Sequence, residues 1–424
     1  MARAPPPARP DRRLAPRPLP AHLVGTTILW LSSRAALPLL KTGLPGSSAP
    51  AQRLRRFAAE IDALGSERLT AALDARAERW LVGVEAYRRH PFRRAADCRP
   101  VVWRQGTTRL VDYGRPGDPV VLLVPSLINR HYVLDLLPER SFVGHLAEHG
   151  LRPLVVDWDE PGPEERRFDL SDYVAERLDP AFEAGRGVAD APIAVVGYCM
   201  GGLLALALAL RRQRDVACLA LLATPWDFHA EHAVPGRLLG AAADRLAAPC
   251  GAGGTVPVDL LQSLFFLVDP FAAERKFVRF AGLDAESAAA RAFVALEDWV
   301  NDGVPLALPT ACDCLRLWYA ENEPGRGVWR VAGRRVTPAE LGRPALVVIP
   351  GGDRIVPPRS AEPLAAALGD ATVLRPALGH VGMMSAARAP AMLWAPVAQW
   401  LRARLAAPGR HRRRLDRRRP PPLD

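Results

Sequence analysis

The stretch from Ile193 to Leu210 constrains the fold of this chain more than any other. It begins with a short apolar, β-branched run, typical of a strand that is buried on both faces. It ends with a run of Ala and Leu, which are strong helix formers. Between the two lies Gly197-Tyr198-Cys199-Met200-Gly201, followed by Gly202. A strand that turns sharply into a helix needs small residues around the turn, because larger side chains would collide there. The pattern therefore predicts a nucleophile elbow that presents Cys199 above a sheet, at a helix N-terminus that favours a thiolate.

Short apolar runs alternate with helical patterns over much of the chain. The runs expected to form strands are Thr107–Tyr113, Val120–Val124, Leu154–Val156, Leu219–Ala223, Ala345–Ile349 and Ala371–Leu374. Helices are expected over Leu170–Gly187 and, at the end of the fold, from about Met392 to Leu405. Strands that alternate with helices predict a mostly parallel, doubly wound sheet of the α/β class.

The remaining segments suggest how the chain is divided. Residues 1–20, rich in Pro and Arg, are expected to be disordered. Residues 21–100 are expected to form an N-terminal helical region, with apolar residues at helical spacing over 52–88. A catalytic domain is expected over 101–405, with a helical, aromatic cap insertion over about 225–343 that covers the site. Residues 406–424 are expected to form a basic, disordered tail.

Composition indicates the cellular compartment of the chain and which classes of ligand to expect. The six cysteines do not form a dense framework, which favours a reducing, cytoplasmic location. Cys312 and Cys314 have no second Cys or His pair at zinc-ligand spacing, so no metal site is expected. The net charge of +11 comes almost entirely from arginine, and we expect no specific nucleic-acid partner.

The apolar run Leu23–Leu31 follows an arginine-rich start, as in a signal peptide, but an amphipathic helix on the domain or on a membrane surface fits it better.

Two further residues at predicted strand ends complete a candidate triad with Cys199. Asp353 follows an apolar strand and a Gly-Gly turn, and His380 lies in the loop G-H-V-G after the last strand. Each alone is open to a plainer reading, as an inert buried thiol, a turn-forming aspartate or a turn histidine. Their order along the chain, nucleophile, acid and then histidine, is that of the α/β-hydrolase fold. We therefore expect His380 to accept the proton of Cys199 and Asp353 to orient the imidazole ring.

The neighbouring loops supply candidates for the oxyanion hole and the substrate pocket. The backbone N–H of Met200 and one N–H from the loop after Val124 are the expected oxyanion donors. The residues of this loop assigned to oxyanion or substrate binding are Leu127, Ile128, Asn129 and His131. Trp226 and Asp227 follow the next strand and are expected to line the pocket.

A thiol at the elbow indicates a particular chemistry. Serine would convert a thioester donor into a stable ester, whereas cysteine forms another thioester, which keeps the acyl group activated. A cysteine elbow therefore favours acyl transfer from thioesters, and an apolar cap would help by excluding water. Some hydrolases also use cysteine, so an esterase or thioesterase activity stays open.

Several longer stretches resemble the polyhydroxyalkanoate synthase family. They are V-P-S-L-I-N-R-H-Y-V-L-D-L-L-P-E-R-S-F, V-V-D-W-D-E-P-G, G-Y-C-M-G-G, D-W-V-N-D-G-V-P-L, G-G-D-R-I-V-P-P and G-H-V-G-M, and they cover about residues 100–400 in the family's order. The resemblance implies an α/β-hydrolase fold with Cys199 as nucleophile, Asp353 as catalytic aspartate and His380 as catalytic histidine. It also implies polymerisation of (R)-3-hydroxyacyl-CoA, with coenzyme A as leaving group and the growing polyester bound as a thioester.

The resemblance also implies partners. Such synthases act as homodimers at granule surfaces, and no cofactor beyond the coenzyme A thioester substrate is expected. The N-terminal region of about 100 residues is short and divergent, as in synthases that need a second subunit. A cysteine-dependent esterase, thioesterase or polyhydroxyalkanoate depolymerase is the alternative activity. A non-catalytic protein associated with granules or membranes is a third reading.

Overall fold

The computed structural model describes residues 13, 16–28, 32, 49–189, 191–230, 243, 250–251, 253–269 and 271–406. Contacts between Cα atoms divide the chain into two compact units. The first combines Met1–Ala95 with Asp259–Asn301, and the second combines Ala96–Val258 with Asp302–Asp424. Most of the predicted disordered N-terminus and all but residue 406 of the predicted basic tail lie outside the described residues.

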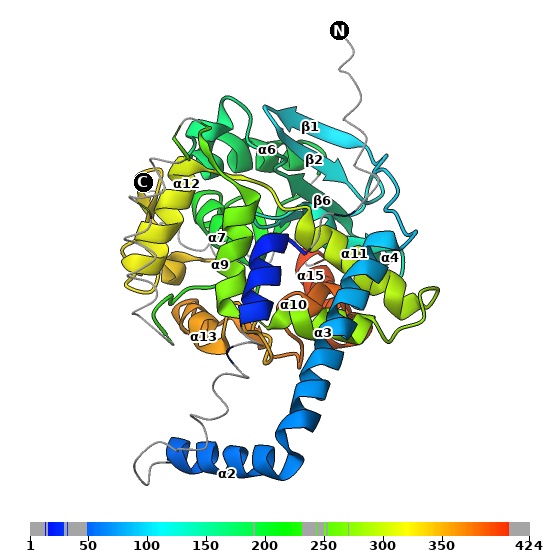
Figure 1. The fold of residues 1–424 in the computed structure, drawn as a ribbon. Helices are drawn as coiled ribbons and strands as arrows, with labels where there is room; N and C mark the ends of the chain where they lie inside the picture. Colours follow the sequence, from blue (N-terminus) through cyan, green and yellow to red (C-terminus); the bar gives the residue numbers. More distant parts are fainter. Residues whose placement is uncertain are drawn as a thin grey trace, which may run out of the picture. The chain divides into compact units, whose positions relative to one another are not determined.

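Helices build the first unit (Figure 1). The helices α2 (Ala49–Leu64) and α3 (Ser66–Arg89) meet at Gly65, whose φ of 80° suits glycine and ends the first helix. The helical spacing predicted over 52–88 is therefore present but divided between two helices. The later part of the unit contains the helices α9 (Val258–Val268), α10 (Ala272–Phe280) and α11 (Ala288–Asn301).

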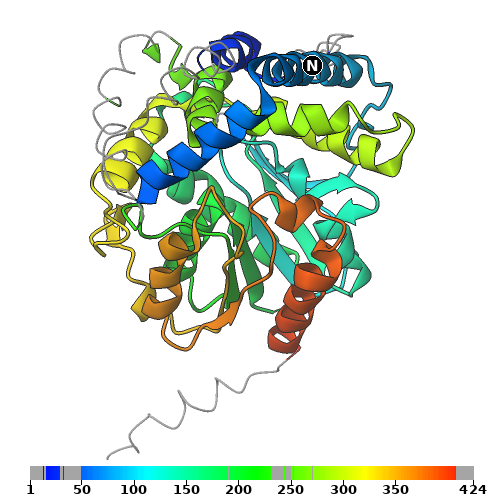
Figure 2. The ribbon, with the colours of Figure 1, turned by 60° about the horizontal axis from the view of Figure 1, so that its bottom comes forward.

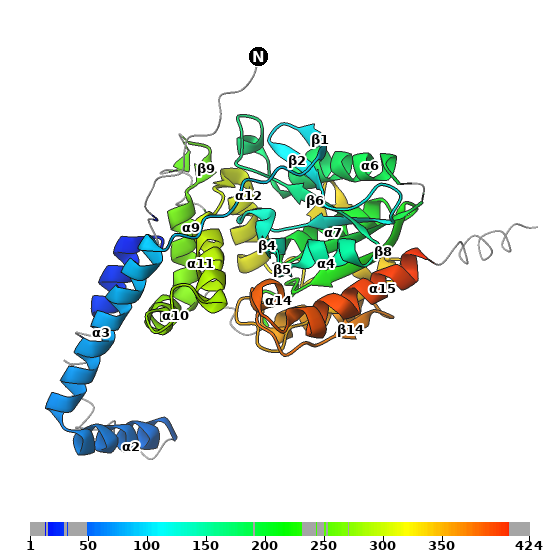
Figure 3. The ribbon, with the colours of Figure 1, turned by 90° about the vertical axis from the view of Figure 1, so that its right-hand side faces the viewer.

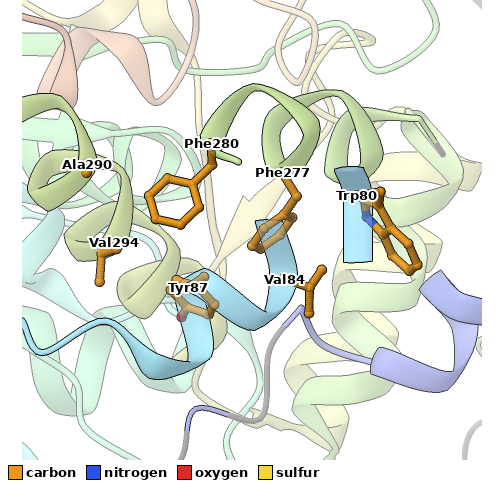
Figure 4. Close-up of a cluster of buried hydrophobic side chains, with 7 residues drawn as sticks. All are labelled: Trp80, Val84, Tyr87, Phe277, Phe280, Ala290 and Val294. Atoms are coloured by element: carbon orange, nitrogen blue, oxygen red, sulfur yellow. The ribbon is translucent and has the colours of Figure 1, made fainter. Parts of the chain in front are cut away.

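The core of the first unit joins its two sequence segments. Its buried members come from α3, α10 and α11 and are Trp80, Val84, Tyr87, Phe277, Phe280, Ala290 and Val294 (Figure 4). The rings of Tyr87 and Phe277 meet edge to face, with centroids 5.6 Å apart. The segment 259–301 thus buries Phe277 and Phe280 against α3.

An eight-stranded sheet forms the centre of the second unit, in the order β1-β2-β6-β3-β7-β8-β13-β14 (Figure 3). Strands β3, β6, β7, β8, β13 and β14 run parallel, whereas β1 and β2 add an antiparallel edge. The strand bounds are β1 Val101–Gln105, β2 Thr108–Asp112, β3 Val120–Val124, β6 Arg152–Asp157, β7 Ile193–Tyr198, β8 Val216–Leu222, β13 Ala345–Val348 and β14 Thr372–Leu374. The predicted mostly parallel, doubly wound sheet is confirmed.

Helices cover the two faces of this sheet. The helix α7 (Met200–Arg211) packs on β3, β7 and β8, and α6 (Asp179–Gly187) lies near β1 and β3. The helices α4 (Phe142–Glu148) and α15 (Ala395–Leu405) contact each other and the sheet (Figure 3). The helix α13 (Pro358–Ala367), orange in Figure 2, packs on β13. The predicted helix over Leu170–Gly187 is interrupted by a π-helical turn, η3 (Tyr173–Leu178).

The segment between β8 and β13 is less uniformly helical than expected. Besides α9, α10 and α11 it contains α12 (Leu308–Asp313), the π-helix η4 (Cys314–Ala320) and two pairs of two-residue strands. These strands are β9 Thr255–Val256, β10 Leu306–Ala307, β11 Arg330–Val331 and β12 Arg334–Arg335. Only its residues 259–301 belong to the first unit, so the boundaries of a cap stay a prediction. Within the described ranges, no helix is both long enough and apolar enough to cross a membrane.

Candidate active site

The turn from β7 into α7 holds Cys199 in an unusual backbone conformation. Its φ of 55° and ψ of −127° lie in a region that side chains other than glycine rarely adopt. The N–H of Cys199 donates to the carbonyl of Leu222 on β8, at 2.9 Å, which fixes the turn to the neighbouring strand. Cys199 is partly exposed, whereas Cys218 is fully buried. The predicted strand, sharp turn and helix around Cys199 are all present.

Crowding explains the glycines around Cys199. A Cβ on Gly201 would collide with the backbone carbonyls of Val124 and Pro125, and a Cβ on Gly202 would collide with the side chain of Thr224. A Cβ on Gly197 would meet Ala205 at 2.8 Å. Each glycine therefore lets α7 start close to a different neighbour, as elbow geometry requires.

Asp353 and His380 meet at the carboxyl ends of β13 and β14. The Nδ1 atom of His380 lies 2.7 Å from Oδ2 of Asp353. The other carboxylate oxygen, Oδ1, accepts the N–H groups of Ile355 at 2.8 Å and Val356 at 2.9 Å. Every carboxylate oxygen of Asp353 is thus bonded, and its side chain is fully excluded from solvent. This arrangement orients the imidazole ring of His380.

The charge environment favours a protonated His380. Burial, the largest influence, lowers its pKa, but the negative charge and hydrogen bond of Cys199 and the hydrogen bond to Asp353 outweigh burial and raise the pKa to about 10. The His380 ring thus lies between a thiol that can ionise and a buried carboxylate.

Tyr198, next to Cys199, holds His380 from a second side. Its ring stacks on the imidazole, with centroids 5.3 Å apart and planes 26° apart. Its hydroxyl donates to the backbone carbonyl of His380 at 3.2 Å. Burial, and then the negative charges of Cys199 and Asp353, raise the pKa of Tyr198, so the phenol stays a donor. In the sequence, its position beside Cys199 was the only signal for this contact, and we did not anticipate it.

The two predicted sources of oxyanion donors lie side by side. Met200 is the first residue of α7, where backbone N–H groups have no partner within the helix. The loop after β3 touches the start of this helix, because the Pro125 backbone lies against Gly201. Leu127 is buried, and Ile128 and Asn129 are half-buried. Which N–H of this loop faces a substrate stays a prediction.

The other predicted pocket residues make contacts within the protein. The buried ring of His131 pairs with the carboxylates of Asp157 and Asp97. Trp226 is buried, and Asp227 accepts the amide of Asn322 at 2.8 Å. Their assignment to substrate binding stays a prediction. No group of three or more His, Cys, Asp or Glu side chains among the described residues could hold a metal ion.

Comparisons with known proteins assign this chain to a family. Residues 119–387 match the family described as the alpha/beta hydrolase fold. The chain is 30% identical over 313 residues to the poly(3-hydroxyalkanoate) polymerase subunit PhaC of Haloferax mediterranei, over 72% of this chain and 63% of that one. Identity to the protein of the same name from Synechocystis is 28%, over 67% of this chain and 78% of that one. A thermophilic esterase structure from Thermogutta terrifontis is 19% identical and aligns with a TM-score of 0.46 over 72% of this chain and 97% of its own. The chain thus spans less than two thirds of the Haloferax protein.

Proposed function

Because this chain belongs to the α/β-hydrolase fold family and its relatives include poly(3-hydroxyalkanoate) polymerase subunits, we propose that it polymerises (R)-3-hydroxyacyl-CoA with release of coenzyme A. One observation supports this most strongly. A cysteine at the elbow, with φ of 55°, stands beside a histidine that is hydrogen-bonded to a buried aspartate. In this proposal Cys199 is the nucleophile, His380 the base and acid, and Asp353 the residue that orients His380.

Acylation follows from the charges of the site. The Cys199 thiolate attacks the thioester carbonyl of the substrate, and the backbone N–H of Met200 and one N–H of the loop after β3 stabilise the oxyanion. The carbon–sulfur bond to coenzyme A then breaks, and protonated His380 gives its proton to the departing thiolate. The acyl group is left on Cys199 as a thioester, close in energy to the donor.

Chain growth uses the same residues in the reverse protonation state. Neutral His380 takes the proton of the 3-hydroxyl group of an incoming (R)-3-hydroxyacyl-CoA, and the oxygen attacks the carbonyl of the Cys199 thioester. An ester bond forms, the Cys199–acyl bond breaks, and Cys199 leaves as a thiolate beside protonated His380. The chain, longer by one unit, is then a coenzyme A thioester that can acylate Cys199 again. The buried Asp353 carboxylate stabilises the imidazolium formed in this step.

The proposal includes the setting of the enzyme. It acts as a homodimer or with a second synthase subunit, and it associates with the surface of polyester granules in the cytoplasm. The Haloferax relative is named a polymerase subunit, so we test for a partner subunit directly. Light scattering of the purified protein, with and without a candidate subunit, measures the assembly.

The product of (R)-3-hydroxybutyryl-CoA decides the activity. Free coenzyme A together with polyester supports the proposal, whereas free coenzyme A together with 3-hydroxybutyrate identifies a thioesterase instead. Cys199→Ala should abolish coenzyme A release. Cys218→Ala is the matched control, because burial raises the pKa of the Cys218 thiol to about 12 and keeps it inert. Turnover by the Cys199 variant at the rate of the unaltered protein would exclude the mechanism.

A further inference from the structure

The loop after β3 is irregular, yet contacts fix it at several successive residues. At its start, the carbonyl of Pro125 accepts the indole N–H of Trp158 at 3.1 Å. The carbonyl of Ile128 accepts the N–H of Val304 at 3.0 Å, and Asn129 forms an isolated β-bridge with Gly303. The partners come from two different segments of the second unit, one at Trp158 and one at Gly303–Val304, so this loop is held from two sides.

Arg130 attaches the loop to the segment that follows β6. Its Nη1 lies 2.7 Å from Asp159 and its Nη2 lies 2.7 Å from Glu160. Its Nε lies 3.7 Å from Asp302, which also accepts the hydroxyl of Tyr132 at 2.9 Å. The planar guanidinium thus spans three carboxylates with a fixed geometry, as lysine could not.

His131 makes a second, more buried attachment to the same segment. Its Nδ1 lies 3.1 Å from Asp157 at the end of β6, and its Nε2 lies 3.9 Å from Asp97. Burial lowers the pKa of His131, but the two carboxylates outweigh burial and raise it. Asp157 is also paired with Arg109, and Asp97 with Arg99. His131 therefore lies between two carboxylates that already have partners, and both carboxylates favour its protonated form.

These ion pairs are an inefficient way to stabilise a fold. Taking charges out of water costs about as much as their attraction returns, so pairs of this kind add little to the free energy of unfolding. They do fix geometry, since each bond restricts the backbone that carries it. An oxyanion hole needs such restriction, because donors displaced by about 1 Å lose much of their effect.

We propose that Arg130 and His131 are positioning residues that fix the preceding backbone, Leu127 to Asn129, so that its N–H group meets the developing oxyanion together with Met200. The inference rests on the proposed acyl transfer at Cys199 and assigns the loop's ion pairs a part in it. Neither side chain takes part in bond making. They act through the backbone of Leu127 to Asn129, which directly precedes them in the chain.

Two other roles give different kinetics. Residues that only stabilise the fold would lower the melting temperature and leave kcat unchanged. Residues that bind substrate would raise KM. Positioning of the oxyanion donors acts on the transition state, so it lowers kcat and kcat/KM together and leaves KM nearly unchanged.

The test compares Arg130→Met, Arg130→Lys and His131→Gln with Arg152→Met in the full chain. Arg152 is the matched control because it makes the same kind of ion pair, at 2.6 Å with Asp112, at the opposite end of strand β6. Single-turnover acylation by (R)-3-hydroxybutyryl-CoA is followed by coenzyme A release and by the mass of the Cys199 peptide. We expect Arg130→Met to slow acylation about tenfold to hundredfold, with KM within about twofold. Arg130→Lys should recover part of the rate. Arg152→Met should leave the rate unchanged and lower only the melting temperature, because it leaves the buried carboxylate of Asp112 without its arginine.

Each outcome bears on the inference. Acylation by Arg130→Met and His131→Gln at the unaltered rate overturns it, and a raised KM with unchanged kcat reassigns the residues to substrate binding. If His131→Gln does not fold, Asp97→Asn removes the charge from the longer contact of His131, at 3.9 Å, and from the ion pair of Asp97 with Arg99. Unchanged acylation in that variant and in Arg130→Met also overturns the inference. Acylation without polymer refutes the proposed polymerisation, but the acylation rates of the Arg130 and His131 variants still test the positioning role. Absence of acylation in the unaltered protein refutes both.

Discussion

Replacing Asp353 by asparagine tests the triad most sharply, because the structure allows the new amide one orientation. Oδ1 of Asp353 accepts two backbone N–H groups, at 2.8 and 2.9 Å, and Oδ2 faces Nδ1 of His380 at 2.7 Å. An asparagine must keep its oxygen on the two backbone donors. The reverse orientation would lose both bonds and bury unsatisfied donors, at a cost of at least about 2 kcal/mol.

The forced orientation makes the amide donate to Nδ1 of His380. The proton of the neutral ring then sits on Nε2, the nitrogen that must accept the proton of Cys199. We expect kcat to fall by about three to four orders of magnitude, as in other triads in which the acid is replaced by its amide. The fold should persist, because the shape of the side chain and both backbone bonds are retained.

Two measurements check this result. Coenzyme A release gives kcat, and the rate at which iodoacetamide alkylates Cys199 reports the thiolate independently of substrate. Asp179→Asn is the control, since Asp179, the first residue of α6, is also a bonded carboxylate but pairs with Arg212 at the end of α7, at 2.6 Å. A kcat within about tenfold of the unaltered protein would refute the reasoning. So would a slow variant whose alkylation shows an unchanged pH dependence.

Four further outcomes are expected. Gly202→Ala should lower the free energy of unfolding, measured in urea, by about 1–3 kcal/mol, because the new Cβ collides with Thr224. Thr224→Ala in the same chain should restore part of this free energy, although the contact of 2.8 Å with the Cβ of residue 224 remains. No recovery in the double variant would contradict the clash. Tyr198→Phe keeps the ring stacking on His380 and loses the hydrogen bond of 3.2 Å, so kcat should fall by less than about tenfold. Tyr198→Leu loses both contacts and should lower kcat further. Equal losses of kcat in the two variants would rule out a role for stacking. Cys199→Ala should lower the pKa of His380 from about 10 toward 6.5, measured by NMR. The stability that the His380 charge supplies is complete below pH 6.5 and is lost as the pH rises toward 10, so a stability that rises over this range would contradict the pairing.

The sequence was informative wherever local pattern decides structure. The β-branched runs predicted β3 with its observed bounds and β7 to within two residues, since a strand buried on both faces must be apolar throughout. The glycines around Cys199 predicted the sharp turn. The chain order predicted that Asp353 and His380 would meet, and they lie in contact.

Features set by contacts between distant segments could not be predicted in this way. The pairing of Arg130 with Asp159 and of His131 with Asp157 depends on the register between β3 and β6, which single-segment patterns do not specify. The edge strand β1 was missed, although V-V-W-R-Q before a glycine carries a strand signal. The sharing of residues 259–301 with the N-terminal helices depends on aromatic residues finding partners far away in the chain.

The divided composition of the first unit has a consequence for biosynthesis. Tyr87 donates its hydroxyl to Asp298, 211 residues later in the chain, at 2.8 Å. At about 5–20 residues per second, a ribosome needs about 10–40 s to make the intervening chain. During that interval Trp80, Val84 and Tyr87 have left the ribosome without Phe277 and Phe280, which later cover them. The nascent protein therefore carries an exposed aromatic surface while its sheet is being made, and chaperones that bind such surfaces have their longest opportunity there.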